Sequence, residues 1–186
     1  MNSSVDHLKQ IPPTSNPLRT ALQSAVAEPH QLLEQIPLMQ GYASGSASDK
    51  EYIAVTRAML AFWGSRAPAS HHLPEAYHEF FESYLEALRG DVGLHMPVES
   101  IETVDELAFY YVLLGSGLGA KVILRNNVDS GFSKRNLLHL AQHSTPLWKD
   151  FIHSHLVAVP QERAARVKKD SRILFDNLLN KIQKIA

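Results

Sequence analysis

Two side chains that could bind or position a metal lie one helical turn apart in the first quarter of the chain. His30 and Glu34 are four residues apart, so on a helix they project from the same face. Val26 and Leu33 share that face, which predicts that His30 points inward. A carboxylate beside an imidazole fixes its tautomer and raises its basicity, as is usual for metal-ligating histidines. The pair therefore predicts either a metal ligand or a core histidine satisfied by a neighbouring glutamate.

Three glycines within five residues lie in the most apolar stretch of the chain. Gly115, Gly117 and Gly119 each cost a helix about 0.5–1 kcal/mol relative to alanine, so their presence needs a reason. Gly115 and Gly119 share one helical face, and Ser116 and Ala120 lie beside them. This strip of small residues allows close approach of a flat ligand or of another helix, and the pattern does not choose between the two. A nucleotide-binding loop is disfavoured because the G-x-G-x-G run follows a helical pattern and not a strand.

The other histidines indicate weaker sites. His71-His72 lies in a predicted solvated loop, and His153 and His155 are two apart on a helix and face different directions. A di-iron carboxylate site in a helical bundle requires two E-x-x-H motifs on facing helices. The chain contains one such motif, from Glu75 to His78, and no partner for it.

Helical patterns follow one another along the chain, and strand-like alternation is nearly absent. A helix is predicted to begin at Asn16-Pro17, because proline suits the first helical position, and Pro29 is predicted to kink or restart it. Capping boxes at Ser48–Glu51 and Thr103–Glu106 predict the starts of two further helices, the second of which runs to about Asn126.

Three more helices complete the predicted order. One begins at Pro74 and ends at Arg89-Gly90, with Gly90 as a left-handed cap. The others cover about 137–157, with an interruption at Pro146, and 161–185, after a polar turn over 127–133. The sequence therefore predicts an all-α fold, a compact multi-helix bundle.

The overall composition narrows the possible functions. Lys and Arg number 18 and Asp and Glu 19, for a net charge of -1, which argues against a broad nucleic-acid-binding surface. The absence of cysteine excludes disulfides and thiolate metal sites and fits a cytoplasmic protein. The apolar stretch around the glycines is predicted to be a buried helix and not a membrane span. We expect a flexible segment over 1–15 and one helical domain over 16–186.

The order and spacing of these motifs resemble the bacterial haem oxygenases, in particular those associated with phytochromes. Residues 18–22, 30–34 and 37–39 resemble the proximal helix of that family, and residues 111–120 resemble its distal helix, including a G-S-x-L-G core. Shorter similarities occur at 85–90, 148–151 and 171–175, so the resemblance extends over about residues 16–180. It implies a haem oxygenase-like helical bundle.

The resemblance also implies roles for individual residues. His30 would be the proximal ligand of the haem iron, oriented by Glu34. The distal helix would cross the other face of the haem, with a kink from Gly115 to Gly119 that leaves room for dioxygen. Ser116 occupies the position where animal members have a catalytic aspartate.

Further residues of the implied haem site surround these. Ala120 continues the distal strip, and Tyr110 matches a family position near the haem propionates. Arg19 and Arg172 are implied as basic partners of the propionates, with Lys168 and Lys169 as alternatives on the last helix.

The implied reaction is the oxidative cleavage of haem to biliverdin, with release of iron and carbon monoxide. Haem would be both substrate and cofactor, electrons would come from a ferredoxin or a flavoprotein reductase, and a phytochrome is a candidate recipient of the biliverdin. Two alternatives stay open: a haem-binding sensor or carrier without turnover, and a structural or regulatory helical module.

Overall fold

A computed structural model describes residues 16–93, 101–126 and 134–186. The predicted all-α class is confirmed, because helices make up nearly all of the regular structure in these ranges. The elements are α1 (Pro17–Gln35), α2 (Pro37–Ser44), α3 (Asp49–Gly64), β1 (Arg66–Pro68), α4 (Glu75–Val92), β2 (Glu102–Val104), α5 (Glu106–Asn126), α6 (Arg135–Asp150), a π-helical turn (Phe151–His155) and α7 (Gln161–Gln183). The segments predicted as a flexible N-terminus (1–15) and a polar turn (127–133) lie outside the described residues.

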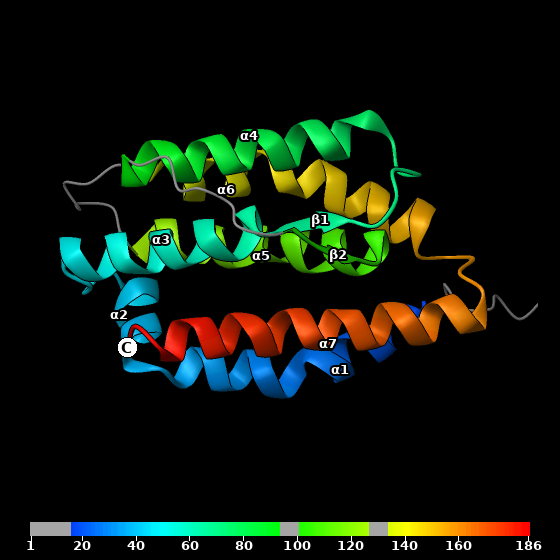
Figure 1. The fold of residues 1–186 in the computed structure, drawn as a ribbon, viewed down its shortest axis with the longest axis horizontal. Coiled ribbons are helices and arrows are strands. Elements are labelled where there is room, and N and C mark those ends of the chain that lie inside the picture. The colour runs from blue at the N-terminus through cyan, green and yellow to red at the C-terminus, as the bar shows by residue number, and fades with distance from the viewer. Residues whose placement is uncertain (1–15, 94–100, 127–133) are drawn as a thin grey trace, which may run out of the picture.

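The helices stack in three levels around α5 (Figure 1). In this view α4 and α6 lie above, α3 and α5 lie in the middle, and α1 and α7 form a parallel pair below, both running from right to left. Helix α5 packs against α6, α7 and α2, and every residue from Glu106 to Leu114 is buried. Such burial on all sides is typical of a core helix.

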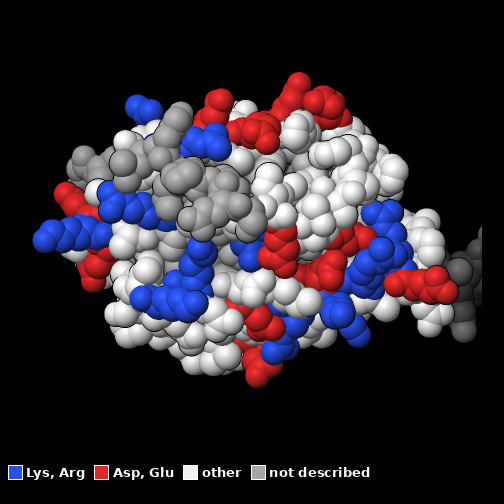
Figure 2. Space-filling view, in the orientation of Figure 1, with Lys and Arg blue, Asp and Glu red and all other residues white. Residues whose placement is uncertain are grey.

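Burial also explains the membrane-like composition of α5. Within the described ranges it is the one helix long and apolar enough to cross a bilayer, yet 56% of its apolar window is buried inside the fold. The prediction of a buried helix is therefore confirmed. Basic and acidic side chains are mixed on the face shown in Figure 2, as on an ordinary solvated surface.

Several helix starts follow the local signals in the sequence. The Asn16 side-chain oxygen accepts a hydrogen bond from the Arg19 backbone N–H at 3.1 Å, and its side-chain nitrogen donates to the Leu156 carbonyl at 3.1 Å. Asn16 thus caps α1 and also ties it to the chain that follows the π-helical turn. The capping box of Ser48 and Glu51 at the start of α3 is confirmed.

Two helix ends differ from the predictions. Thr103 is not a cap, because it lies in β2, where it pairs in parallel with Ala67 of β1. Asp105 has that role instead, and its side chain accepts a hydrogen bond from the Leu107 N–H at 2.9 Å. The left-handed glycine that ends α4 is Gly93 (φ 66°) and not Gly90, which lies inside the helix.

The prolines inside the helices interrupt less than predicted. Helix α1 continues through Pro29, whose ring is buried, and α6 continues through Pro146 to Asp150. Each proline removes one backbone hydrogen bond, and packing against neighbouring helices holds the remaining turns in place. Within α5, none of the three glycines has a positive φ, so the helix is unbroken where the sequence suggests an interruption.

Gly117 is the position at which α5 and α6 approach most closely. A Cβ atom built there would lie 2.5 Å from the Ser144 Cβ and 3.0 Å from the Leu140 carbonyl oxygen. The first distance is too short for non-bonded atoms and the second is unusually tight, and the carbonyl belongs to the backbone of α6. This glycine therefore serves helix packing, one of the two explanations that the sequence leaves open.

We predict opposite effects on stability for alanine at two glycines of α5. Gly117→Ala should lower the free energy of unfolding by about 1–3 kcal/mol, because α6 must move away. Gly119→Ala should raise it by up to about 1 kcal/mol, because no atom lies within 4 Å of its Cβ position and alanine favours the helix. Urea unfolding of both variants measures the difference, and a Gly117→Ala variant as stable as the parent would contradict the packing.

Candidate functional site

A large cavity lies between α1 and α5 and has a volume of about 720 Å³. Sites for small molecules and cofactors commonly measure about 300–1,000 Å³. Its walls also include parts of α2, α3, α6 and α7, so six helices contribute to it. The lining residues are Gln23, Val26, His30, Leu33, Glu34, Met39, Gln40, Ala43, Ser44, Met59, Tyr111, Val112, Gly115, Ser116, Leu118, Gly119, Val122, Ile123, Asn126, Trp148, Phe175 and Leu178.

His30 lines this cavity from α1. Its side chain is 51% exposed, so it faces the open cavity and is not enclosed in the core, unlike a satisfied core histidine. Its Nδ1 lies 3.6 Å from Glu34 Oε1, close enough for charge attraction but longer than a normal hydrogen bond. The Phe175 ring lies 5.6 Å from the imidazole, centre to centre, and supports it from α7. Nε2 has no hydrogen-bond partner among the described residues and is available to a ligand.

The glycine strip of α5 forms another wall of the same cavity. Gly115 and Gly119 both line it, and a Cβ at Gly119 would meet no atom within 4 Å. At Gly115 the nearest atom to such a Cβ is in the Trp148 ring, at 3.9 Å. The two explanations for the glycines therefore apply to different residues: Gly117 faces α6, whereas Gly115 and Gly119 face open space.

Ser116 also lines the cavity, and its hydroxyl is already engaged. Its Oγ donates a hydrogen bond to the Val112 carbonyl oxygen at 2.9 Å. The hydroxyl has one proton to donate, so its oxygen can only accept from a ligand or a water molecule.

Charge is scarce in the cavity. Its ionisable lining residues are His30, Glu34 and Tyr111, and no Lys or Arg is among them. Burial raises the pKa of Tyr111, while the positive charge of nearby Arg19 acts in the opposite direction, so the phenol stays neutral near pH 7. This arrangement suits a large, mainly apolar molecule that one imidazole can bind, while Arg19 lies near Tyr111 but outside the lining.

Six of the residues suggested by the sequence, Arg19 and Arg172 among them, do not line this cavity. Tyr110 lines a different cavity on another face of α5, and Ala120 is buried without lining either cavity. Lys168 borders a shallow groove between α1 and α7, and Lys169 is exposed on α7.

Arg172 is occupied by another task. Its guanidinium lies 2.7 Å from Glu28 and 3.2 Å from Asp176, and it donates to the Ala25 carbonyl oxygen at 3.4 Å. These contacts raise the pKa of Arg172, with the hydrogen bond to Glu28 as the main cause. The side chain therefore joins α7 to α1 and does not line the cavity.

Tyr111 is the cavity residue that sequence reasoning missed. It lies four residues before Gly115 and eight before Gly119, so all three fall on one helical stripe. That spacing could have identified it. By contrast, Met39 and Met59 reach the cavity from α2 and α3 through tertiary packing, and no local pattern indicates their position.

No family model matches this chain, and no curated protein is significantly similar to it. The functional argument therefore depends on the residues of the cavity and on the order of the motifs.

We predict that filling the cavity from Gly119 blocks the binding of an apolar dye. Gly119→Leu should weaken binding of anilinonaphthalene sulfonate by about tenfold, equivalent to about 1.4 kcal/mol, because the new side chain occupies the same space. Fluorescence titration gives the dissociation constant, and Gly119→Ala, with one methyl group, should bind within about twofold of the parent. Equal dye binding by the leucine variant would show that the cavity is not the binding site.

Proposed function

We propose that this protein binds haem in the large cavity and cleaves it oxidatively to biliverdin, with release of iron and carbon monoxide. The main support is that His30 of α1 and the Gly115–Gly119 strip of α5, the two segments that resemble the proximal and distal helices of bacterial haem oxygenases, line one cavity. This pairing joins residues more than 80 positions apart and does not follow from the sequence pattern alone.

The cavity residues are compatible with haem. Haem is a flat apolar ring with an iron that accepts an imidazole and an edge that has two carboxylates. The cavity provides apolar walls, an imidazole nitrogen without a hydrogen-bond partner, and glycines where the wall needs to be thin. Glu34 is the one carboxylate in the lining, and it lies beside His30.

In this proposal His30 would hold the haem iron through Nε2. Glu34 would orient the imidazole from the Nδ1 side, and Phe175 would limit its rotation. Glu34 lies 3.6 Å from Nδ1 in the present geometry, and a small rotation of either side chain would shorten that contact to a hydrogen bond.

The α5 wall would control space and protons on the other side. Gly119 leaves open volume, and the Ser116 oxygen would accept a hydrogen bond from a water molecule and hold that water in place. Arg19, close to Tyr111, would attract an acidic edge of the ligand. Bound haem supplies the iron that activates dioxygen, with electrons from a ferredoxin or a flavoprotein reductase.

A second candidate is a haem-binding sensor or carrier without turnover. The observation that favours it is that no carboxylate of α5 lines the cavity and that the Ser116 hydroxyl donates into its own helix. If the protein is a haem oxygenase, we predict that it is cytoplasmic and that it supplies biliverdin to a phytochrome.

We predict that hemin binding requires His30. Adding hemin to the full chain should give a Soret band, and His30→Ala should weaken binding by more than about tenfold, because both the ligand and its orienting glutamate lose their function. His153→Ala is the matched control, because His153 is exposed on the π-helical turn away from the cavity. Equal binding by the His30 and His153 variants would contradict the proposed site.

Turnover separates the two candidates. With hemin bound, a reductase system and dioxygen should remove the Soret band and produce the red absorption of biliverdin if the protein is a haem oxygenase. A Soret band that persists through this treatment, but is lost in His30→Ala, would establish the sensor or carrier instead.

A further inference from the structure

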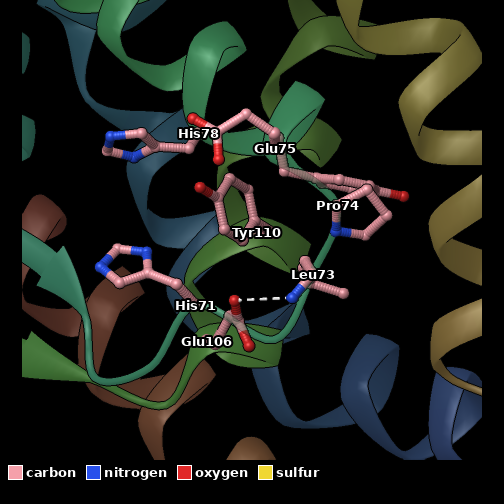
Figure 3. Close-up of a pocket in the computed structure, with 8 residues that line it drawn as sticks. His71, Leu73, Pro74, Glu75, His78, Glu106 and Tyr110 are labelled. Carbon is pink, nitrogen blue, oxygen red and sulfur yellow. Dashed lines mark hydrogen bonds between the residues drawn. The ribbon is translucent and has the colours of Figure 1, made fainter.

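A second cavity lies on a different face of α5 and shares no lining residue with the first (Figure 3). Its volume is about 270 Å³, and it lies between the β1–α4 connection, the first turns of α4 and the first turns of α5. The lining residues are His71, Leu73, Pro74, Glu75, Tyr77, His78, Glu106 and Tyr110. The proposed haem function uses none of these side chains.

Tyr110 presents an unpaired hydroxyl to this cavity. The side chain is 1% exposed, and its hydroxyl has no hydrogen-bond partner among the described residues. Figure 3 shows the hydroxyl directed toward His78 and Glu75. Tyr77, beside it at a ring distance of 5.4 Å, is fully satisfied, because its hydroxyl donates to Asp150 at 2.8 Å. The hydroxyl keeps some exposure to the cavity, where it can bond a water molecule or a ligand.

His78 adds a second unpaired polar atom. Its Nδ1 is buried without a hydrogen-bond partner, and the ring of His71 lies 5.4 Å away in an edge-to-face arrangement. Two unsatisfied polar groups from different helices, Tyr110 of α5 and His78 of α4, therefore border the same space.

Glu106 holds the wall of the cavity in a fixed shape. Its carboxylate is 2% exposed and accepts hydrogen bonds from Ser70 Oγ at 3.2 Å and from the backbone N–H groups of His72 and Leu73, each at 3.1 Å. These bonds fix the β1–α4 connection against α5. The cavity is thus preformed, with the Glu106 carboxylate held in its base.

The charges around the cavity favour a cation. Glu75 and Glu106 line it, and no Lys or Arg does. Acidic side chains also gather along the upper edge of Figure 2, where α4 presents its exposed glutamates. Burial and the nearby Glu106 raise the pKa of Tyr110, so its phenol adds no further charge near pH 7. Carboxylate and phenol oxygens and an imidazole ring nitrogen can accept hydrogen bonds, which an ammonium group donates.

The size of the cavity separates an organic cation from a metal ion. A volume of 270 Å³ holds about nine water molecules at about 30 Å³ each, far more than a bare ion requires. Among the residues described, no three His, Asp or Glu side chains are placed to hold a metal ion together. The rings of Tyr77 and Tyr110 instead provide aromatic surface that attracts an alkylammonium group.

We propose that this cavity binds a small organic molecule with a primary ammonium group. Glu75 is the counter-ion, Tyr110 and His78 accept hydrogen bonds from the ammonium, and the rings of Tyr77 and Tyr110 contact the alkyl part. The site is independent of the proposed haem function, so either proposal can fail without the other.

The test uses n-butylammonium chloride as the probe and 1-butanol, its neutral isostere, as the reference ligand, at constant ionic strength on the full chain. Histidine side-chain NMR signals of His71 and His78 report occupancy, and calorimetry gives the affinity. We expect saturable binding of butylammonium that shifts both histidines and is at least about tenfold tighter than binding of 1-butanol.

Variants assign the binding to individual residues. Glu75→Gln should weaken butylammonium binding by about tenfold, whereas Glu79→Gln, one turn further on the exposed face of α4, should leave it within about twofold. Tyr110→Phe should weaken binding while it keeps the ring, and thermal unfolding shows whether the variant is folded.

Three results would overturn the proposal. Equal affinity for butylammonium and 1-butanol would show that the positive charge of the ligand does not contribute to binding. Equal losses in Glu75→Gln and Glu79→Gln would show attraction by the acidic surface of α4 without a site. Zinc chloride that saturates the signals of His71 and His78, with no saturable response to butylammonium, would identify a metal site instead.

Discussion

The close contact between α5 and α6 at Gly117 is the constraint on which the rest of the structure depends. With α6 packed directly on its backbone, α5 is held at the centre of the bundle, and its first nine residues are buried on every side. Gly117 lines neither of the two cavities, which occur on other parts of the α5 surface. One is lined by the glycines in the second half of the helix, and the other by residues of its first turns. A single helix thus serves as a packing core and as a wall of both cavities.

Much of this fold follows from short-range signals. The starts of α1 and α3 depend on side chains within three residues of the first turn, so Asn16 and Ser48 are recognisable in the sequence. The start of α5 is different, because Thr103 is taken into a parallel strand pair with β1, a partner more than 30 residues away. Gly90 was a reasonable end for α4 by composition, but the helix continues for two further residues to Gly93.

The candidate site shows the same division between local and distant information. Spacing within one helix places His30 with Glu34 and Gly115 with Gly119, and the structure keeps both pairs in one cavity. The assignment of Tyr110 to that cavity is sensitive to a shift of one residue, because neighbouring residues of a helix point about 100° apart. Tyr111 faces the large cavity and Tyr110 the small one. Arg172 could not be placed from the sequence, since its partner Glu28 lies on another helix.

The side chain of Asn16 meets two opposite demands at once. Its oxygen accepts a hydrogen bond from a backbone N–H of α1, and its nitrogen donates a hydrogen bond to the carbonyl oxygen of Leu156, just after the π-helical turn. Aspartate would satisfy the first demand but would place a negative oxygen against a carbonyl, and serine is too short to reach both groups. The junction between α1 and the π-helical turn that precedes α7 therefore requires a carboxamide at position 16. Helix capping alone would also accept aspartate or serine.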